Sequence, residues 1–247
     1  SFILMYYFDY AATTPVSAAV AAAMVETLTE QFGNPSSQYP MGMAARDALA
    51  AHRAVLADTL GCNADELFFT SCGTESDNWA IQAALHYGRH RGRHIITTAV
   101  EHSAVLEPCK FLAQQGYDVT FLKPDRHGKI TVQQVEDALR EDTVLVSIMS
   151  VNNETGNVYP VPEIARMLKA RKSQALLHTD AVQMFLKLPL DAKQCGADLI
   201  SISAHKIGGP KGIGALYISG AIQSKILPLL RGGGQERGLR SGTEATA

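Results

Sequence analysis

The chain has 247 residues, of which 46% are apolar, and this is enough to bury the core of one large domain or at most two. Its 22 basic and 24 acidic residues leave a net charge of −2, which gives no reason to expect nucleic acid or a membrane surface as a partner. The four cysteines are widely and irregularly spaced, and this pattern disfavours disulfides and structural zinc and favours a reducing cytoplasm.

The residue patterns predict helices and short strands that alternate between residues 67 and 179. The expected helices are residues 17–31, 41–60, 74–91, 103–115, 131–140 and 161–171. The expected strands are residues 67–70, 94–98, 118–122, 144–149, 175–179, 198–203 and 214–218. Such alternation is typical of an α/β fold with a mostly parallel sheet flanked by helices. Ligands bind such sheets beyond the carboxyl ends of the strands, so the residues that follow each strand are the candidates for function.

The first candidate is the helix start after strand 67–70. Thr74 is a good N-cap residue there, and Asp77 stands three positions later, where a capping acid belongs. The exposed backbone N–H groups of this helix start would suit a phosphate. An ordinary capped helix is the alternative interpretation.

Two further strand ends carry polar residues that suit either turns or a ligand. His102 follows strand 94–98 near a helix start, where a lone histidine is commonly structural, although its flat ring could stack on a planar ligand. Asn152 and Asn153 follow strand 144–149 and precede Gly156. Adjacent asparagines before a glycine usually form a turn, but they could equally present an amide to a ligand.

Asp180 follows an apolar strand and is expected to lie at the end of the sheet, partly desolvated. A buried carboxylate is costly unless it meets a cation or hydrogen-bond donors. No arginine lies within five residues of Asp180, and Lys187 is the nearest lysine. Asp180 therefore requires a partner from elsewhere, and the polar side chain of Gln183 stands beside it.

The last candidate is Lys206, which lies between two strands, after Ser203 and His205 and before a glycine-rich loop. Lysines in such loops are usually solvated. A partly buried lysine can instead lose its proton and attack a carbonyl to form a Schiff base. One ligand, pyridoxal 5′-phosphate, would use five of these features. It has an aldehyde for the lysine, a phosphate for the helix start and a flat ring for the histidine, with a pyridine nitrogen for Asp180 and a phenolic oxygen for Gln183.

Eight stretches, taken together and in order, resemble the cysteine desulfurases. These enzymes fall within the class V aminotransferase group of fold-type I pyridoxal-phosphate enzymes, and the branch most similar to this chain feeds iron–sulfur cluster assembly. The matching stretches are residues 9–15, 32–37, 70–78, 101–102, 151–156, 178–183, 203–206 and 237–243. The resemblance covers essentially the whole chain. It implies that residues 1–14 form an N-terminal segment that packs with a small domain, and that residues 15–247 form the cofactor-binding large domain with a seven-stranded sheet.

The resemblance also implies roles for single residues. Lys206 is the Schiff-base lysine, and Lys206 or His102 moves protons while the His102 ring stacks on the cofactor. The residues implied to hold the cofactor phosphate are Gly73, Thr74, Ser203 and His205. No metal is expected.

The remaining implied contacts concern the cofactor ring and a second subunit. Asp180 pairs with the pyridine nitrogen, and Gln183 pairs with the phenolic oxygen. Asn153 lies beside the cofactor and the substrate carboxylate. Thr243 reaches the phosphate of the other subunit in a homodimer.

The activity implied by the resemblance is conversion of L-cysteine to L-alanine, with the sulfur passed as an enzyme persulfide toward a scaffold protein. Members of the family continue for about a hundred residues or more, in a small domain that carries the nucleophilic cysteine. The cysteines of this chain, none of which matches that nucleophile, are Cys62, Cys72, Cys109 and Cys195. The chain is therefore expected to be truncated and inactive alone.

Two alternatives remain at this point. One keeps the cofactor and changes the reaction, as in another class V aminotransferase, a selenocysteine lyase or an isopenicillin-type lyase. The other is a non-catalytic subunit that binds partners through the same fold. Lys206 counts against this second alternative, because a scaffold does not need a Schiff-base lysine.

Overall fold

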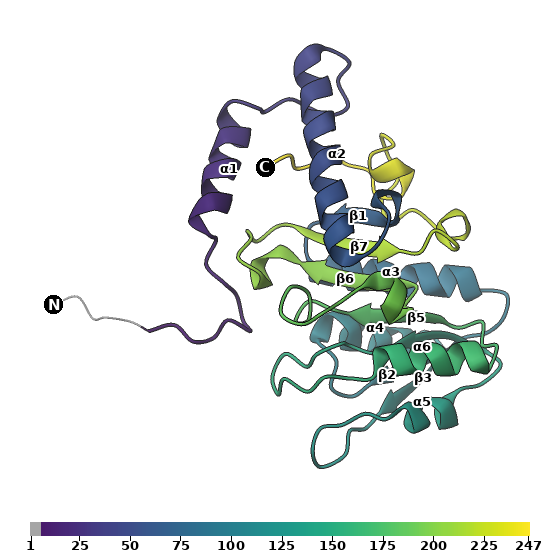
Figure 1. Cartoon of the computed structure of the whole chain (residues 1–247). Coiled ribbons are helices and arrows are strands. Elements are labelled where there is room, and N and C mark those ends of the chain that lie inside the picture. The colour runs from purple at the N-terminus through teal and green to yellow at the C-terminus, as the bar shows by residue number, and fades with distance from the viewer. Residues whose placement is uncertain (1–5) are drawn as a thin grey trace.

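A seven-stranded sheet forms the centre of the computed structural model, which describes residues 6–247. The strand order is β1-β7-β6-β5-β4-β2-β3 (Figure 1). The strands are β1 Leu67–Thr70, β2 His94–Thr98, β3 Asp118–Leu122, β4 Thr143–Ser147, β5 Leu176–Asp180, β6 Leu199–Ser203 and β7 Gly214–Ile218. All seven predicted strands are confirmed within a few residues at their ends. The first five residues of the predicted segment 1–14 lie outside the described residues.

The sheet is mostly parallel, as predicted. The pairs β2–β3, β2–β4, β4–β5 and β5–β6 are parallel, whereas β7 runs antiparallel to both β1 and β6. The reversal follows from the short connection between β6 and β7, because a parallel pair needs a long crossover. That short connection is the glycine-rich loop that carries Lys206.

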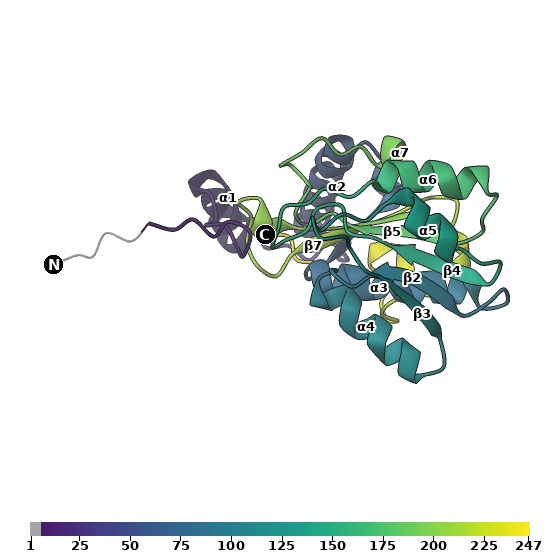
Figure 2. The same cartoon turned by 90° about the horizontal axis from the view of Figure 1, so that it is seen from below.

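Helices cover both faces of the sheet. The helices are α1 Ala18–Thr29, α2 Pro40–Leu60, α3 Gly73–Gly88, α4 Ser103–Gln114, α5 Val132–Ala138, α6 Val161–Ala170 and the unpredicted four-residue α7 Ala192–Cys195. Figure 2 shows α3 and α4 on one face and α5, α6 and α7 on the other. The helix α1 stands apart from these layers and buries none of its residues within the described part of the chain (Figure 1).

The core is divided by the sheet into two apolar clusters. Neighbouring residues of one strand point to opposite faces, so Ile95 packs with Trp79 on the α3 side while Ile96 packs with Ile164 on the α6 side. The inner strands are buried along their whole length, which gives rigid strand ends. Across residues 6–247, the helices are all too short or too polar to cross a membrane.

Candidate active site

A cavity of about 690 Å³ opens at the carboxyl ends of β5 and β6, where the fold class predicts a ligand. Nine of the ten predicted site residues line it. They are Gly73, Thr74, His102, Asn153, Asp180, Gln183, Ser203, His205 and Lys206. Thr243 lies exposed in the C-terminal segment, apart from this lining, so its predicted contact across a dimer stays a prediction.

Lys206 ends a short 3₁₀ turn that follows β6, and its side chain is partly buried. Its Nζ donates to the carbonyl oxygens of Ala11 at 2.6 Å and Ala12 at 2.7 Å. Burial lowers the pKa of the Lys206 ammonium, and the positive charge of Lys187 lowers it further, whereas Asp180 and Asp9 oppose the shift. The amine is thus closer to its nucleophilic, unprotonated form than an exposed lysine would be.

The N-terminal segment lies directly against the lysine loop. The Thr14 backbone N–H and hydroxyl both donate to the His205 carbonyl oxygen, at 2.8 Å and 2.9 Å. The Gly208 backbone N–H donates to the Thr14 hydroxyl at 2.7 Å. The His205 ring Nδ1 lies 3.1 Å from the Thr13 hydroxyl. These contacts between residues about 190 positions apart make the segment one wall of the cavity.

Asp180 is the last residue of β5 and is only 6% exposed, as the sequence predicted. It accepts a hydrogen bond from the Val182 backbone N–H at 2.9 Å. Burial raises the pKa of Asp180 to about 7, and the nearby charge of Asp77 adds to the shift. Beside it, the Gln183 amide donates to the Ala11 carbonyl at 2.8 Å and accepts from Lys187 Nζ at 2.7 Å, which fixes the orientation of the amide.

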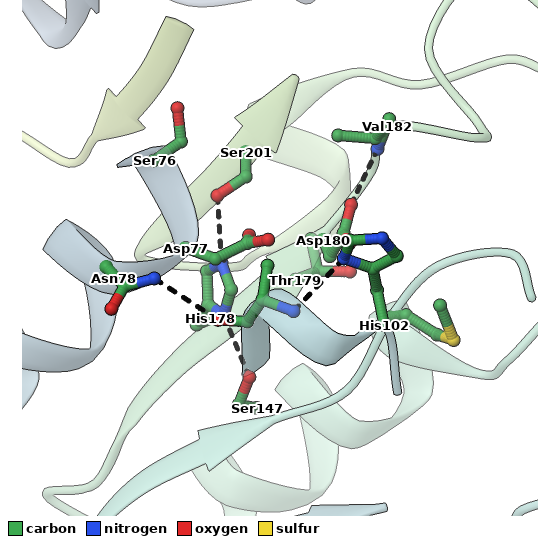
Figure 3. Close-up of polar contacts among 12 residues, drawn as sticks. Ser76, Asp77, Asn78, His102, Ser147, His178, Thr179, Asp180, Val182 and Ser201 are labelled. Carbon is green, nitrogen blue, oxygen red and sulfur yellow. Dashed lines mark hydrogen bonds and ion pairs between the residues drawn. The ribbon is translucent and has the colours of Figure 1, made fainter. Parts of the chain in front are cut away.

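His102 is the N-cap of α4, and its Nδ1 accepts a hydrogen bond from the Ala104 backbone N–H at 3.1 Å. Since Nδ1 is the acceptor, a neutral ring carries its proton on Nε2. Figure 3 shows the His102 ring beside Asp180, and His102 is exposed where it lines the cavity. The histidine is therefore both a cap and an exposed ring at the site.

The helix start of α3 differs from its prediction in one respect. The N-cap is Cys72, without a side-chain cap, and Thr74 is already the second helical residue. Thr74 was therefore wrongly predicted as the cap, because the helix begins two residues earlier, where Gly73 lies close to Val182 and Ser203. A Cβ at Gly73 would lie 3.0 Å from Val182 Cγ2 and 3.6 Å from Ser203 Cβ.

Ser203 has a feature that calls for a ligand. Its hydroxyl is buried and has no hydrogen-bond partner among residues 6–247. The hydroxyl lines the cavity next to the N-terminus of α3, whose free backbone N–H groups favour an anion. An acceptor-rich group such as a phosphate would satisfy both.

The two adjacent asparagines have different tasks. The Asn152 carbonyl oxygen accepts from the backbone N–H groups of Glu154 and Thr155 at 3.0 Å and 2.9 Å, and its amide donates to the Val100 carbonyl. Asn152 thus forms the turn, while Asn153 is half-buried and lines the cavity. The turn predicted from this motif is confirmed at Asn152, and the contact of Asn153 with a ligand stays a prediction.

Asp77 is the site residue that the sequence interpretation missed. Its predicted capping role is wrong, since it is 1% exposed and lines the cavity floor. Helical spacing gave a signal, because Asp77 stands four residues after Gly73 and shares its face of α3. One carboxylate oxygen of Asp77, one of Asp180 and a ring nitrogen of His102 lie within 4.8 Å of one another.

The cavity beyond the strand ends thus brings together a lysine, a histidine and two carboxylates. The mostly parallel seven-stranded sheet flanked by helices is the fold of the type I pyridoxal-phosphate transferases. Residues 6–246 match the profile of the aminotransferase class-V family, so the chain belongs to that family. Among curated relatives, the chain is 48% identical over 238 residues to the cysteine desulfurase IscS of Methanosarcina thermophila, a match that covers 96% of the chain and 58% of the relative. It is 47% identical over 243 residues to the cysteine desulfurase IscS of Vibrio atlanticus, covering 97% and 60%.

Solved structures of similar fold also include NifS-like proteins. A NifS-like protein superimposes with a TM-score of 0.95 at 42% identity, covering 98% of this chain and 66% of that one. The structure titled SspA in complex with cysteine superimposes with a TM-score of 0.92 at 44% identity, covering 98% and 69%. The chain spans about 60% of the length of the curated relatives it matches.

Proposed function

We propose that this chain is the cofactor-binding domain of a cysteine desulfurase that binds pyridoxal 5′-phosphate and converts L-cysteine to L-alanine. The observation that best supports this proposal is the placement of Lys206, with its lowered pKa, in one cavity with the buried Asp180. In this proposal residues 15–247 form the large domain, the protein is a homodimer, and its sulfur passes to a scaffold protein for iron–sulfur clusters.

The residues present fit the cofactor at both of its ends. The unpartnered Ser203 hydroxyl and the start of α3 suit the phosphate. Asp180, which has no lysine or arginine within ion-pair distance in the described structure, suits a protonated ring nitrogen. When bound, pyridoxal 5′-phosphate supplies an electron sink for charge that develops on the substrate Cα.

The chain itself contributes the positioning and the proton transfers. Lys206 Nζ would hold the cofactor aldehyde until the substrate amine displaces it. The freed amine would then take a proton from the substrate, because its pKa is lowered by burial and by Lys187. The amide of Gln183, held by Lys187, faces the cavity as a donor for the phenolic oxygen. Asn153 stands at the wall where the substrate carboxylate would lie.

The cysteine that accepts the sulfur is proposed to be none of the four described here. The attacking species is a thiolate, but burial raises the pKa of Cys62 to about 11 and that of Cys109 to about 12. Burial also raises the pKa of Cys195, which lies in α7 and is not among the residues that line the cavity. Cys72 lines the cavity but belongs to the turn before α3.

Replacing Lys206 by alanine tests the proposal. The wild-type protein incubated with pyridoxal 5′-phosphate should turn yellow, and borohydride should fix the cofactor on the peptide that contains Lys206. The variant K206A should bind no reducible chromophore, whereas K211A, in the same loop but outside the cavity lining, should behave as the wild type. A chromophore fixed on another lysine would refute the assignment.

The substrate is tested separately with L-cysteine. We expect the 247-residue chain to bind the cofactor but to release no alanine from cysteine, for want of a positioned thiolate. Steady alanine release, with a persulfide mapped to one of the four cysteines, would show that the acceptor lies within this chain. A protein extended to the full length of its curated relatives should release alanine from L-cysteine. If it does not, the desulfurase reaction is excluded and another reaction of the class V aminotransferases is favoured.

A further inference from the structure

We propose, on the basis of the function above, that Asp77 acts as a second carboxylate beneath the cofactor ring and strengthens the hold of Asp180 on a protonated ring nitrogen. Asp77 approaches from α3 and Asp180 from the end of β5, and Figure 3 shows the two carboxylates turned toward one another. Carboxylate oxygens of the two residues lie within 4.8 Å, together with a ring nitrogen of His102. Two negative charges this close, both withdrawn from water, favour one shared proton or one cation between them.

The protein supplies no partner that neutralises Asp77. Its Oδ1 accepts no hydrogen bond from any residue of the described chain, although His178 Nε2 lies 3.4 Å away. His178 is completely buried and lies between two hydroxyls, with Ser147 Oγ 2.8 Å from Nδ1 and Ser201 Oγ 3.0 Å from Nε2. Burial lowers the pKa of His178 to about 4, so the ring is neutral at physiological pH and leaves the charge of Asp77 in place.

The other charged groups near Asp77 and Asp180, which together we call the cavity floor, do not neutralise the charge of Asp77 either. Glu101, which precedes α4, is a third buried carboxyl group and accepts from the Met149 backbone N–H at 3.0 Å. Burial raises the pKa of Asp77 to about 7, against a smaller opposite effect of the Ser201 hydroxyl. His102, at the start of α4, and Lys206, in the loop after β6, also line the cavity. The floor thus has a strong affinity for one added positive charge.

A ring nitrogen that carries a proton brings that charge to Asp180. Asp77 raises the proton affinity of Asp180 and, once the ring is docked, that of the ring nitrogen, so the protonated ring is favoured. A ring of the same shape with carbon in place of the nitrogen gains nothing from Asp77. This difference separates an electrostatic role of Asp77 from a role in packing.

The test compares two ligands in cofactor-free protein. The variant D77N should lose about tenfold or more of its affinity for pyridoxal 5′-phosphate at pH 8, while its affinity for 1-deazapyridoxal 5′-phosphate should change little. D198N is the matched control, because Asp198 is also mostly buried but lies at the other end of the sheet. Equal losses for the two ligands in D77N would overturn the proposal, and a wild-type protein that binds neither ligand would refute the proposed cofactor itself.

A second measurement needs no variant and covers the case in which D77N does not fold. Carbon-13 NMR of the aspartate carboxyl groups in cofactor-free wild-type protein should show Asp77 and Asp180 titrating as a coupled pair in two separated steps. Addition of pyridoxal 5′-phosphate should remove the upper step, because the ring proton replaces the shared proton. Two independent titrations, neither of them altered by the cofactor, would contradict the proposal.

Discussion

Lys206 and Lys187 form a pair of like charges whose separation is set by Gln183. Lys187 Nζ donates to the Gln183 side chain, and the Gln183 amide and Lys206 Nζ donate to the same Ala11 carbonyl. Lys187 therefore serves two purposes, since it orients the amide of Gln183 and lowers the pKa of Lys206. A residue outside the cavity lining thus lowers the pKa of the lysine that we propose as the cofactor-binding amine.

Replacing Lys187 by methionine should raise the pKa of Lys206, by about half a unit or more, because a nearby positive charge is removed. The pH dependence of Lys206 acetylation, followed by mass spectrometry in cofactor-free protein, measures this shift. K211M serves as the control, since Lys211 acts on His205 and not on Lys206. An unchanged profile in K187M would show that the two charges are screened from each other.

The C-terminal segment is fastened to the sheet by one buried ion pair. Arg53 of α2 makes two contacts with the Glu236 carboxylate, at 2.8 Å and 2.6 Å, and the same carboxylate accepts from the Phe69 backbone N–H in β1 at 3.0 Å. Glu236 and Arg237 have φ values of 46° and 56°, in the left-handed region that costs energy for residues with a side chain. The ion pair holds this strained turn against α2 and β1.

Glu236→Gln should destabilise the protein by about 3 to 5 kcal/mol, because it leaves Arg53 charged and buried without its partner. The double variant R53M/E236L removes both charges and should recover much of that loss. The free energy of unfolding in urea measures the stability of both variants. E107Q is the control, because it breaks an exposed ion pair with Lys110 and should change the free energy of unfolding by less than about 1 kcal/mol. A double variant as unstable as the single one would mean that the strained turn itself needs the carboxylate.

At the scale of the whole molecule, the cavity floor makes the stability of the cofactor-free protein depend on pH. Burial raises the pKa of Asp77 and Asp180 to about 7 and that of Glu101 to about 8. These groups bind protons more tightly in the folded state. Their contribution is fully present below about pH 4, where the unfolded carboxyl groups are protonated too, and is lost progressively as the pH rises through the folded pKa values of about 7 to 8. His178 acts in the opposite direction, because its folded pKa of about 4 makes the protein lose stability as the pH falls from 6.5 toward 4.

Between about pH 4 and pH 6.5 the three carboxyl groups outweigh the single His178, so the stability that these four groups contribute falls from about pH 4 to pH 8. The urea midpoint should therefore fall between pH 6 and pH 8, and pyridoxal 5′-phosphate should reduce this fall by neutralising the floor. D77N should flatten the same profile, because it removes one of the three carboxyl groups. A midpoint that rises toward pH 8 in the wild type would show that the carboxyl groups are ionised without penalty.

Much of the fold and most of the site residues could be predicted from local patterns. Short β-branched runs and amphipathic spacing are properties of neighbouring residues, so the seven strands appear where they were expected. The ends of parallel strands meet at one edge of a sheet, and this rule alone brings Asp180, Ser203 and His102 together. The start of α3 was less predictable, because the close approach of Gly73 to Val182 and Ser203 places the N-cap at Cys72 and not at Thr74.

The sequence by itself determined the class of fold, the lysine and the carboxylate, because each of these rests on residue type and position along one strand or loop. Only the tertiary structure decided that Asp77 faces Asp180 and that residues 9–14 close over Lys206. Those contacts join segments about 100 and 190 residues apart, and which face of a helix meets which strand is fixed by packing in the core. The electrostatics of the floor, and hence the pKa values of its carboxyl groups, follow from that packing and not from any local pattern.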